Sequence, residues 1–304
     1  MKENFELSGG LLINKPEGVT SFDVVSKVRK LFSTKKVGHT GTLDPMATGV
    51  LTVLVGRGVK AADFLVNHDK SYRAGLLLGI TTDTEDITGK VLEKCDKLPT
   101  EEQVRDACAR FVGNIKQIPP MYSALKVNGR KLYDLARQGI EVEREAREIS
   151  IYSLSVTEVS ASEGKYILDV SCSKGTYIRT LCADIGRELG CGGVMSSLER
   201  SSLGGFGLDM CTTLKELEDE SFEERCKRII PLDTLFSGYK KAVLPPFFEK
   251  LARSGNEIYQ KKISTRFEDG EIIALYGERG FFAVGEVRQY PEGSAIKPIK
   301  QLVL

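Results

Sequence analysis

The chain has 304 residues, of which 41% are hydrophobic and 28% charged, and its formal net charge is +1. This composition is that of an ordinary globular protein and excludes disordered and fibrous chains, and no apolar run reaches membrane-spanning length. The small net charge excludes a protein that coats nucleic acid through bulk charge, so any RNA binding must be local. The length predicts one large domain and a smaller one.

Cysteine and histidine usage gives no support for a metal site or a disulfide framework. The seven cysteines form no Cys-x-x-Cys pair, and their odd number favours reduced, structural thiols. The two histidines, His39 and His68, belong to no Cys/His cluster, so we expect no zinc. The stretch MKENFELSGGLLINK lacks the apolar core of a secretory signal, which predicts a cytoplasmic protein.

Residues 20–32 predict a helix, because valines and other apolar residues recur at helical spacing after Thr20 or Ser21 as N-cap. A basic run with no acid in it follows the wetter face of this helix and continues into the next loop: Lys27, Arg29, Lys30, Lys35 and Lys36. Such a run is commonly a solvated face. Here it is also a candidate grip on RNA.

The loop after this helix reads KVGHTGTLDPMATGVL and contains one acid, Asp44. A lone loop carboxylate is commonly a turn residue. However, Gly41 and Gly49 allow close backbone approach and Pro45 fixes φ after the acid, so the segment can present one side chain rigidly. Residues 49–56 form a β-branched apolar run that predicts a buried strand.

Residues 70–86 begin with a strand whose alternation puts Tyr72 on the face of the apolar residues, toward a core or a cleft. A core tyrosine with a satisfied hydroxyl is the alternative. Residues 99–113 predict an amphipathic helix with Thr100 and Gln103 as a capping box and Gly113 as its end.

Residues 119–139 contain a proline pair, an Asn-Gly turn and a short helix ending at Gly139. Cations alternate there with Tyr122 and Tyr133, a composition suited to phosphate contacts and base stacking. An exposed helical hairpin is the alternative. The cations are Lys126, Arg130, Lys131 and Arg137.

Residues 165–190 predict a strand, a turn and an amphipathic helix. If Thr176 is the N-cap, Arg179 lies in the first turn, where a cation opposes a helix dipole that favours anions by about 0.3–1 kcal/mol. We therefore expect an anion, a phosphate or a carboxylate, beside Arg179. A freely solvated arginine is the alternative. From residue 238 onward, short strands separated by ERG and PEG predict a small β-domain.

Four stretches together resemble the bacterial TruB family of tRNA pseudouridine synthases: GHTGTLDPMATGVL, KSYRAGLLLGITTDTED, IPPMYSALKVNGRKLYDLARQGIEV and CSKGTYIRTLCADIGRELGCGG. The resemblance runs from about residue 10 to 205, and the tail is similar to the family's small PUA-like RNA-binding domain. It implies an α/β (α+β) fold, in which a mixed, largely antiparallel sheet forms a catalytic domain over residues 1–237. An RNA-gripping insertion would span about 118–148, and a β-rich PUA-like domain residues 238–304.

The family converts uridine 55 in the T arm of tRNA to pseudouridine without metal or cofactor. The resemblance makes Asp44 the nucleophile, with Arg179 orienting it, and assigns Tyr72 to stacking on the base with a possible part in proton transfer. Tyr177 and Leu198 match positions that line the uracil pocket, and His39 matches the histidine that enters the RNA loop when the nucleotide leaves its stack.

The basic residues then become candidates for phosphate contacts with the T arm, and the chain is expected to act as a monomer. Whether the carboxylate attacks the sugar or the uracil ring stays open at this point. A non-catalytic RNA-binding protein and a hydrolytic uracil glycosylase are rival interpretations. A third, a phosphate-binding enzyme built on SKGTYIR as an anion nest, has neither a Walker nor a dinucleotide motif beside it.

Overall fold

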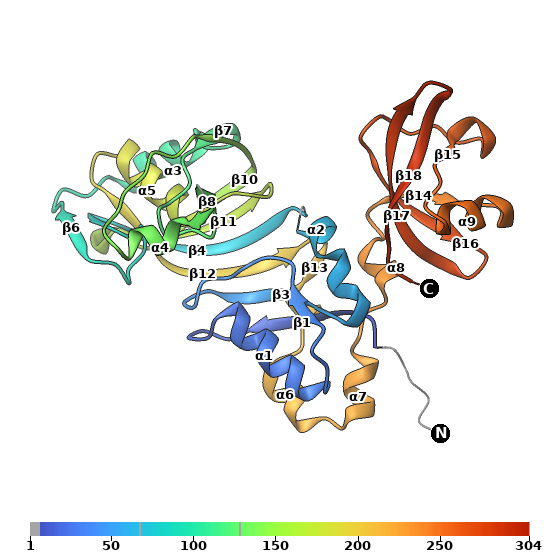
Figure 1. The fold of residues 1–304 in the computed structure, drawn as a ribbon. Coiled ribbons are helices and arrows are strands. Elements are labelled where there is room, and N and C mark those ends of the chain that lie inside the picture. Colours follow the sequence, from blue (N-terminus) through green and yellow to red (C-terminus); the bar gives the residue numbers. More distant parts are fainter. Residues whose placement is uncertain (1–6, 67, 128, 304) are drawn as a thin grey trace.

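The computed structural model describes residues 7–66, 68–127 and 129–303, and Figure 1 shows two sheets side by side. The larger sheet runs in the order β1 (Gly9–Lys15), β3 (Thr48–Val55), β12 (Gly193–Leu203), β4 (Lys70–Leu78), β11 (Lys165–Cys172), β10 (Arg147–Ser160) and β7 (Gly113–Gln117). Two short strands join it at the side, β2 (Val37–His39) on β3 and β13 (Phe206–Gly207) on β12. Among its described pairs only β12 with β3 is parallel, which confirms the predicted mixed, largely antiparallel sheet.

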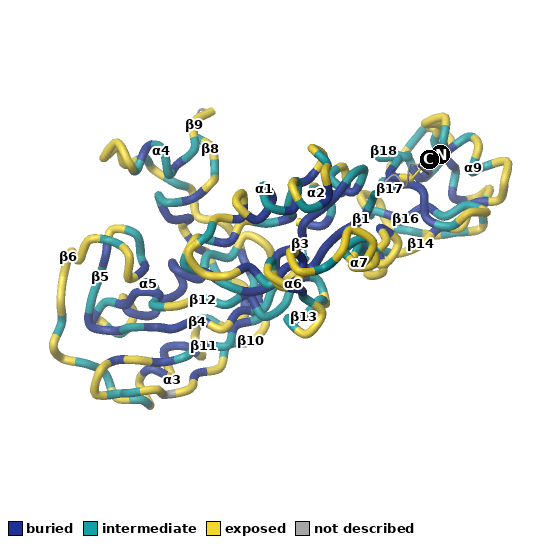
Figure 2. The backbone as a smooth tube through the Cα atoms, turned by 90° about the horizontal axis from the view of Figure 1, so that it is seen from below, coloured by how far each residue is buried: buried dark blue, intermediate teal, exposed yellow. Residues whose placement is uncertain are grey.

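The long helices pack against this sheet through the apolar residues that recur at helical spacing in the sequence. Helix α1 (Ser21–Leu31) packs beside β2, and α5 (Ile178–Glu188) packs on β12 and β4 next to α3 (Glu101–Ala109). The main core joins these helices to the sheet. Strands β1 and β3 are almost continuously buried, whereas β11 alternates between buried and less buried residues, and Figure 2 shows the sheet in these burial colours. The shorter helical segments are η1 (Gly56–Ala61), α2 (Ala62–Leu65), η2 (Ala161–Glu163), η3 (Leu208–Met210), α6 (Leu214–Asp219), α7 (Phe222–Lys227) and α8 (Leu232–Leu235).

Helix starts follow their capping chemistry, with two corrections to the predicted ends. Thr20 caps α1 and forms a capping box with Asp23, and Thr100 caps α3 through Gln103, as predicted. Gly113 does not end α3, whose C-cap is Arg110; it begins β7 instead. The N-cap of α5 is not Thr176, because that hydroxyl donates to the Ser173 carbonyl; Tyr177 takes the place. Strand β2 was not predicted.

The segment between β7 and β10 forms a separate arm. It contains the hairpin of β8 (Lys126–Val127) and β9 (Arg130–Lys131), then α4 (Leu132–Ala136). Figure 2 shows this arm standing off from the main sheet, with much of its surface exposed. A smaller hairpin, β5 (Ile80–Thr82) with β6 (Val91–Lys94), follows β4.

The smaller sheet begins at Lys240 and confirms the predicted β-rich tail. Its order is β14 (Lys240–Val243), β16 (Ile272–Gly277), β17 (Gly280–Tyr290), β18 (Gly293–Gln301) and β15 (Ile258–Tyr259), with α9 (Pro246–Arg253) and η4 (Gln260–Lys262). A cluster that includes Leu54, Phe236 and Phe281 packs this sheet against the larger one. The domain boundary at residue 238 stays a prediction. Within the described residues no helix has the length and apolar character needed to cross a membrane.

The parallel contact between β3 and β12 depends on Gly49. Its φ is +103°, and a Cβ there would lie 2.3 Å from the Arg200 carbonyl oxygen. We expect Gly49→Ala to lower the free energy of unfolding by about 3 kcal/mol, because it adds a backbone clash to the strain of a positive φ. Gly139→Ala is the matched control, since φ is +70° there but the space is open; it should cost about 1 kcal/mol. Equal losses in urea-induced unfolding would contradict the clash.

Candidate active site

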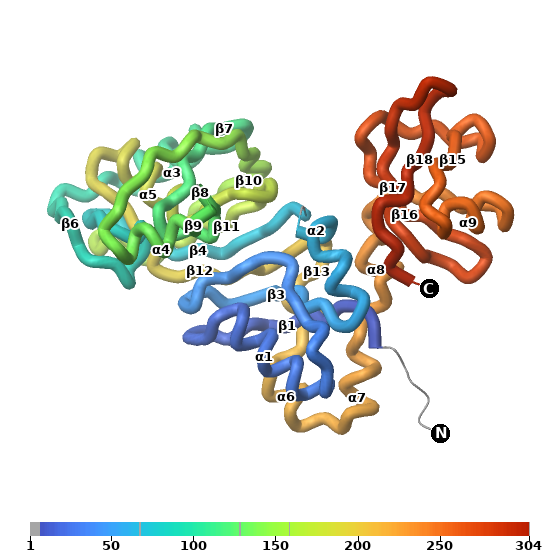
Figure 3. The backbone as a smooth tube through the Cα atoms, in the orientation of Figure 1, coloured from blue at the N-terminus to red at the C-terminus, as the bar shows by residue number. Residues whose placement is uncertain are grey.

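One open cleft of about 990 Å³ brings together five residues predicted for the site: Asp44, Tyr72, Tyr177, Arg179 and Leu198. They come from the β2–β3 loop, β4, the start of α5 and β12, elements far apart in the sequence. Figure 3 shows how β12 brings the late part of the chain between β3 and β4. The cleft therefore lies where the two halves of the larger sheet meet.

The Asp44 loop is fastened on both sides of the carboxylate. The Ser21 hydroxyl accepts the Leu43 N–H at 2.9 Å and lies 3.1 Å from the Leu43 carbonyl oxygen, to which it donates. The buried ammonium of Lys15 donates to the Pro45 carbonyl at 3.3 Å and to the Val19 carbonyl at 2.7 Å. Burial lowers the pKa of Lys15, while the charge of Asp44 acts in the opposite direction. The flanking residues are thus fixed and the side chain of Asp44, 37% exposed, faces the cleft.

Arg179 joins Asp44 to two other parts of the chain. Its Nε lies 3.1 Å from Asp44 Oδ2, and its Nη1 lies 3.7 Å from Asp86 Oδ2. The same guanidinium donates to the Thr84 carbonyl at 3.3 Å and to the Tyr122 carbonyl at 2.8 Å. Because its side chain is only 9% exposed, its geometry is fixed by these partners. The anion expected beside the first turn of α5 is therefore a pair of carboxylates.

Asp86 is itself held in place. Its Oδ1 accepts the Thr88 N–H at 2.9 Å and the hydroxyls of Thr84 and Thr88 at 2.8 and 2.6 Å. The Thr82 hydroxyl donates to the Asp86 carbonyl at 2.7 Å. The threonine-rich turn after β5 thus holds Asp86 against the guanidinium of Arg179.

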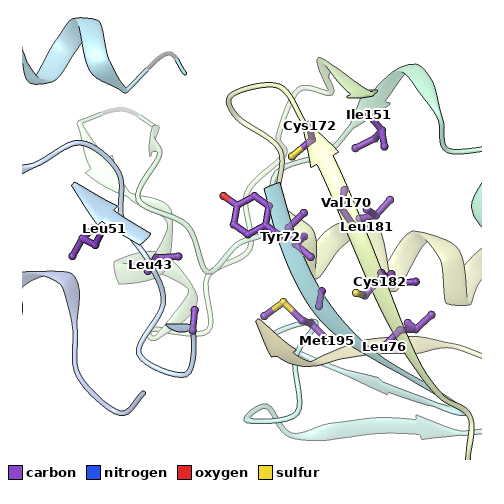
Figure 4. Packing of buried hydrophobic residues seen from close by; sticks show 14 of the residues in the cluster. Leu43, Leu51, Tyr72, Leu76, Ile151, Val170, Cys172, Leu181, Cys182 and Met195 are labelled. Carbon is purple, nitrogen blue, oxygen red and sulfur yellow. The ribbon is translucent and has the colours of Figure 1, made fainter. Parts of the chain in front are cut away.

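Tyr72 is buried, with its ring at the boundary between core and cleft. Figure 4 shows the ring extending from β4 toward Leu43, away from the packed side chains around Leu181. Burial raises the pKa of Tyr72, while the charge of Arg200 and a hydrogen bond with it act in the opposite direction. The phenol therefore stays protonated at neutral pH and offers a flat face to a ligand.

Tyr177 is positioned through its backbone by Gln117, which is buried at the end of β7. The Gln117 amide oxygen accepts the Tyr177 N–H at 2.8 Å, and its amide nitrogen donates to the Tyr177 carbonyl at 3.0 Å. Burial raises the pKa of Tyr177. The side chain thus faces the cleft as a neutral phenol from a fixed backbone.

His39 is the one predicted base-site residue that is absent from the cleft lining. It ends β2, where Nδ1 accepts the Gly41 N–H at 3.3 Å. Burial and the charge of Arg200 lower the pKa of His39, so the imidazole is neutral at pH 7. Its role in the RNA loop stays a prediction.

Most of the predicted phosphate-binding cations lie outside the lining, and Arg137 is the one that contributes to it. Lys27 forms an ion pair with Glu218 on α6, whereas Lys30, Lys35, Lys36, Lys126 and Arg130 are exposed. Lys131 donates to the Tyr133 hydroxyl at 3.0 Å. The cations that do line the cleft are Lys70, Arg137, Arg147, Arg179, Lys174 and Arg200.

Four residues that shape the site were not singled out from the sequence: Lys15, Asp86, Gln117 and Arg200. Asp86 lies within the quoted TTDTED stretch, where an acid among threonines could have suggested a hydrogen-bonded carboxylate. Arg200, 1% exposed, gives no such signal, because one arginine in a strand is indistinguishable from a surface residue. Among the described side chains, no group of three or more His, Cys, Asp or Glu could hold a metal ion.

Comparison with known families decides between the interpretations of this site. Residues 29–178 match the model of the TruB family pseudouridylate synthase N-terminal domain, and residues 179–237 match the tRNA pseudouridylate synthase B C-terminal domain. The chain belongs to the TruB family. It is therefore a pseudouridine synthase, an isomerase that converts uridine in tRNA to pseudouridine.

Similar curated proteins agree over most of the chain. The tRNA pseudouridine synthase B of Alkaliphilus oremlandii is 46% identical over 93% of this chain and 94% of its own. That of Clostridium tetani is 43% identical over 92% and 96%. The family assignment does not depend on a short motif alone.

Solved structures support the fold as well. A chain in the crystal structure of a Cbf5–Nop10–Gar1 complex superposes with a TM-score of 0.77 at 23% identity, over 98% of this chain and 85% of that one. A chain in a structure of an H/ACA RNP bound to a substrate RNA containing 2′-deoxyuridine gives 0.73 at 22%, over 97% and 85%. Because the superposition covers nearly the whole chain, the fold agreement includes the smaller sheet, consistent with the PUA-like prediction.

Proposed function

We propose that this enzyme isomerises the uridine at position 55 in the T arm of tRNA, with Asp44 as nucleophile and without metal or cofactor. The observation that carries the proposal is the Asp44–Arg179 pair at 3.1 Å in a cleft lined by Tyr72, Tyr177 and Leu198. This arrangement supplies a held carboxylate next to a flat, partly apolar slot for a base. Isomerisation of a nucleoside requires both.

The reaction breaks the bond between C1′ and N1 of uridine and forms a bond between C1′ and C5. The uracil must turn in place, the proton on C5 must leave, and N1 must regain a proton. Asp44 holds the intermediate covalently, and its place at the cleft serves attack either at C1′ or at C6 of the ring. Tyr72 stacks on the base, since its protonated phenol is a poor base.

The depth of the cleft supports base flipping. Tyr72 is 7% exposed, so a uracil that remains stacked in an RNA loop does not reach its ring. Eversion costs a few kcal/mol, which contacts in the cleft can offset. His39, next to the loop that carries Asp44, is our candidate for filling the space the base leaves.

Every group that this mechanism requires comes from a single chain, which supports a monomer as the active form. We further propose that the enzyme works in the cytoplasm, where its tRNA substrate is found. Size-exclusion chromatography with light scattering during turnover tests the monomer; a dimer as the sole active species would contradict it.

Incubation of the purified protein with a T-arm RNA hairpin tests the proposed function. Chemical mapping should find pseudouridine at position 55 and nowhere else, in the presence of a metal chelator. The RNA mass should stay constant, because isomerisation neither adds nor removes atoms, whereas a glycosylase would release uracil. Modification of another position, or dependence on an added metal, would overturn the proposal.

Removing a positive charge from the arm tests whether its cations bind RNA phosphates or only face solvent. Lys126 is exposed in β8, so we expect Lys126→Met to weaken T-arm binding and to reduce the slope of log K against log salt by about 1. Lys27→Met is the matched control: because Lys27 already pairs with Glu218, its loss should change the slope less. Equal slopes for Lys126→Met and the unmodified protein would contradict the grip.

A further inference from the structure

Two cations, Arg200 and Lys70, lie beside Tyr72 in the wall of the cleft. Arg200 pairs directly with Tyr72 across β12 and β4, and Lys70 lies two residues before Tyr72 on β4. Cross-strand partners and residues two apart project from the same face of a sheet. The three side chains therefore share one face, which opens into the cleft.

Neither cation has a carboxylate partner within 4.0 Å among the described residues. Arg200 donates from Nε to the Val50 carbonyl at 2.7 Å and from Nη2 to the Gly41 carbonyl at 3.3 Å. Lys70 donates to the carbonyls of His68 at 2.7 Å and Val66 at 3.3 Å. Carbonyl oxygens satisfy these hydrogen bonds but leave the net charge uncompensated.

The acids that lie nearby are engaged elsewhere. Asp44 forms its ion pair with Arg179, and Asp69 accepts the Tyr152 hydroxyl at 3.0 Å. Burial lowers the pKa of Lys70 to about 8, and the charges of Arg200 and Lys174 act in the same direction, against Asp69 and Cys172. Two positive charges therefore repel each other in a partly dry wall, an arrangement that an arriving anion would stabilise.

We propose that Arg200 and Lys70 bind a backbone phosphate of the target nucleotide. The inference rests on the proposed function, because it takes the everted uridine as the occupant of the cleft. A neutral uracil cannot compensate the two charges, whereas the phosphate next to it brings an anion close to the base that Tyr72 faces. The carbonyls of Val50 and Gly41 fix the guanidinium before the RNA binds, so binding of the phosphate costs little side-chain entropy.

This assignment has a consequence for substrate choice. The cleft then selects a uridine within a polynucleotide chain over free uridine, because the nucleoside lacks the charged group. Selection of this kind acts at the target position itself, separately from any contact that the arm makes with the T stem.

RNA with one neutral methylphosphonate, placed 5′ or 3′ of the target uridine, tests the phosphate directly. Binding is measured in the Asp44→Asn background, so that the RNA stays unreacted, with Lys70 intact or replaced by Met. For one of the two positions we expect the neutral linkage to weaken binding about 10-fold. The same linkage should have little further effect in Lys70→Met, because both changes remove one interaction. Lys70→Arg should restore the charge effect.

Lys94→Met serves as the control for general charge, because Lys94 is exposed on β6 and is no part of the cleft lining. It should leave the methylphosphonate effect intact. At Arg200 the test uses Arg200→Lys, which keeps the positive charge. Arg200→Met would in addition leave the carbonyls of Val50 and Gly41 without their donor. The melting temperature of Arg200→Lys reports whether the chain around these carbonyls stays in place.

The inference would be overturned if the methylphosphonate left binding unchanged at both the 5′ and the 3′ position. It would also be overturned if the losses in affinity from the methylphosphonate and from Lys70→Met multiplied when the two changes were combined. The proposed function is judged separately, by pseudouridine mapping with the unmodified protein on natural RNA. If pseudouridine forms at position 55 but the two losses in affinity multiply, only the assignment of Arg200 and Lys70 to a phosphate is refuted.

Discussion

Asp44→Asn should abolish isomerisation, with a loss in single-turnover rate of at least about 10⁴-fold. The amide is nearly the same size as the carboxylate but is a poor nucleophile. The cleft lining contains two other acids, Asp86 and Glu148. Asp86 is buried, and Glu148 forms no ion pair with Arg179 among the described residues. Binding of T-arm RNA should change only modestly, because the cleft keeps its shape. The rate is measured as release of label from C5 of the target uridine.

Asp219→Asn is the matched control, because Asp219 is an exposed carboxylate at the end of α6. It should react at the rate of the unmodified enzyme. Turnover by Asp44→Asn at an undiminished rate would refute the nucleophile. A large loss of RNA affinity with a normal rate from bound RNA would assign Asp44 to binding instead.

Arg179→Lys should lower the single-turnover rate about 100-fold, an effect comparable to the loss of one preorganised donor in an active site. Lysine keeps the positive charge but has no planar fork, so it cannot reach Asp44 and the carbonyls of Thr84 and Tyr122 at once. RNA affinity should fall much less than the rate, since the residue acts by orienting the nucleophile.

Arg187→Lys on the same helix is the control, because Arg187 is largely exposed and pairs only with Asp184 among the described acids. Its rate should be unaffected. The orienting role would be wrong if Arg179→Lys turned over normally, or if its defect vanished at saturating RNA.

The sequence predicted most of the elements around the site because local chemistry determines them. Thr20 and Thr100 each precede a residue that completes a capping box, and the alternation around Tyr72 gives a strand with one buried face. The first-turn position of Arg179 indicated a missing anion, and two carboxylates lie there. These inferences needed only neighbours within a few residues.

The parts that were missed depend on contacts between distant residues. Nothing near Lys15 in the sequence shows that its ammonium would be buried under the Pro45 carbonyl, and Gln117 meets Tyr177 only because β7 lies at the edge of the sheet beside α5. Arg200 shares this property, since its charge stands out only once β12 is paired with β4. The topology itself came from the family resemblance.

The position of β12 ties the enzyme's chemistry to the order in which the chain is made. Strands β1 and β3 emerge from the ribosome early, and β4 follows, but the strand that joins them is synthesised more than a hundred residues later. Until then two half-sheets expose unpaired edges, with the nucleophile on one and the stacking tyrosine on the other. A nascent chain that stops before Gly193 carries Asp44, Tyr72 and Arg179 and still lacks the strand that assembles them.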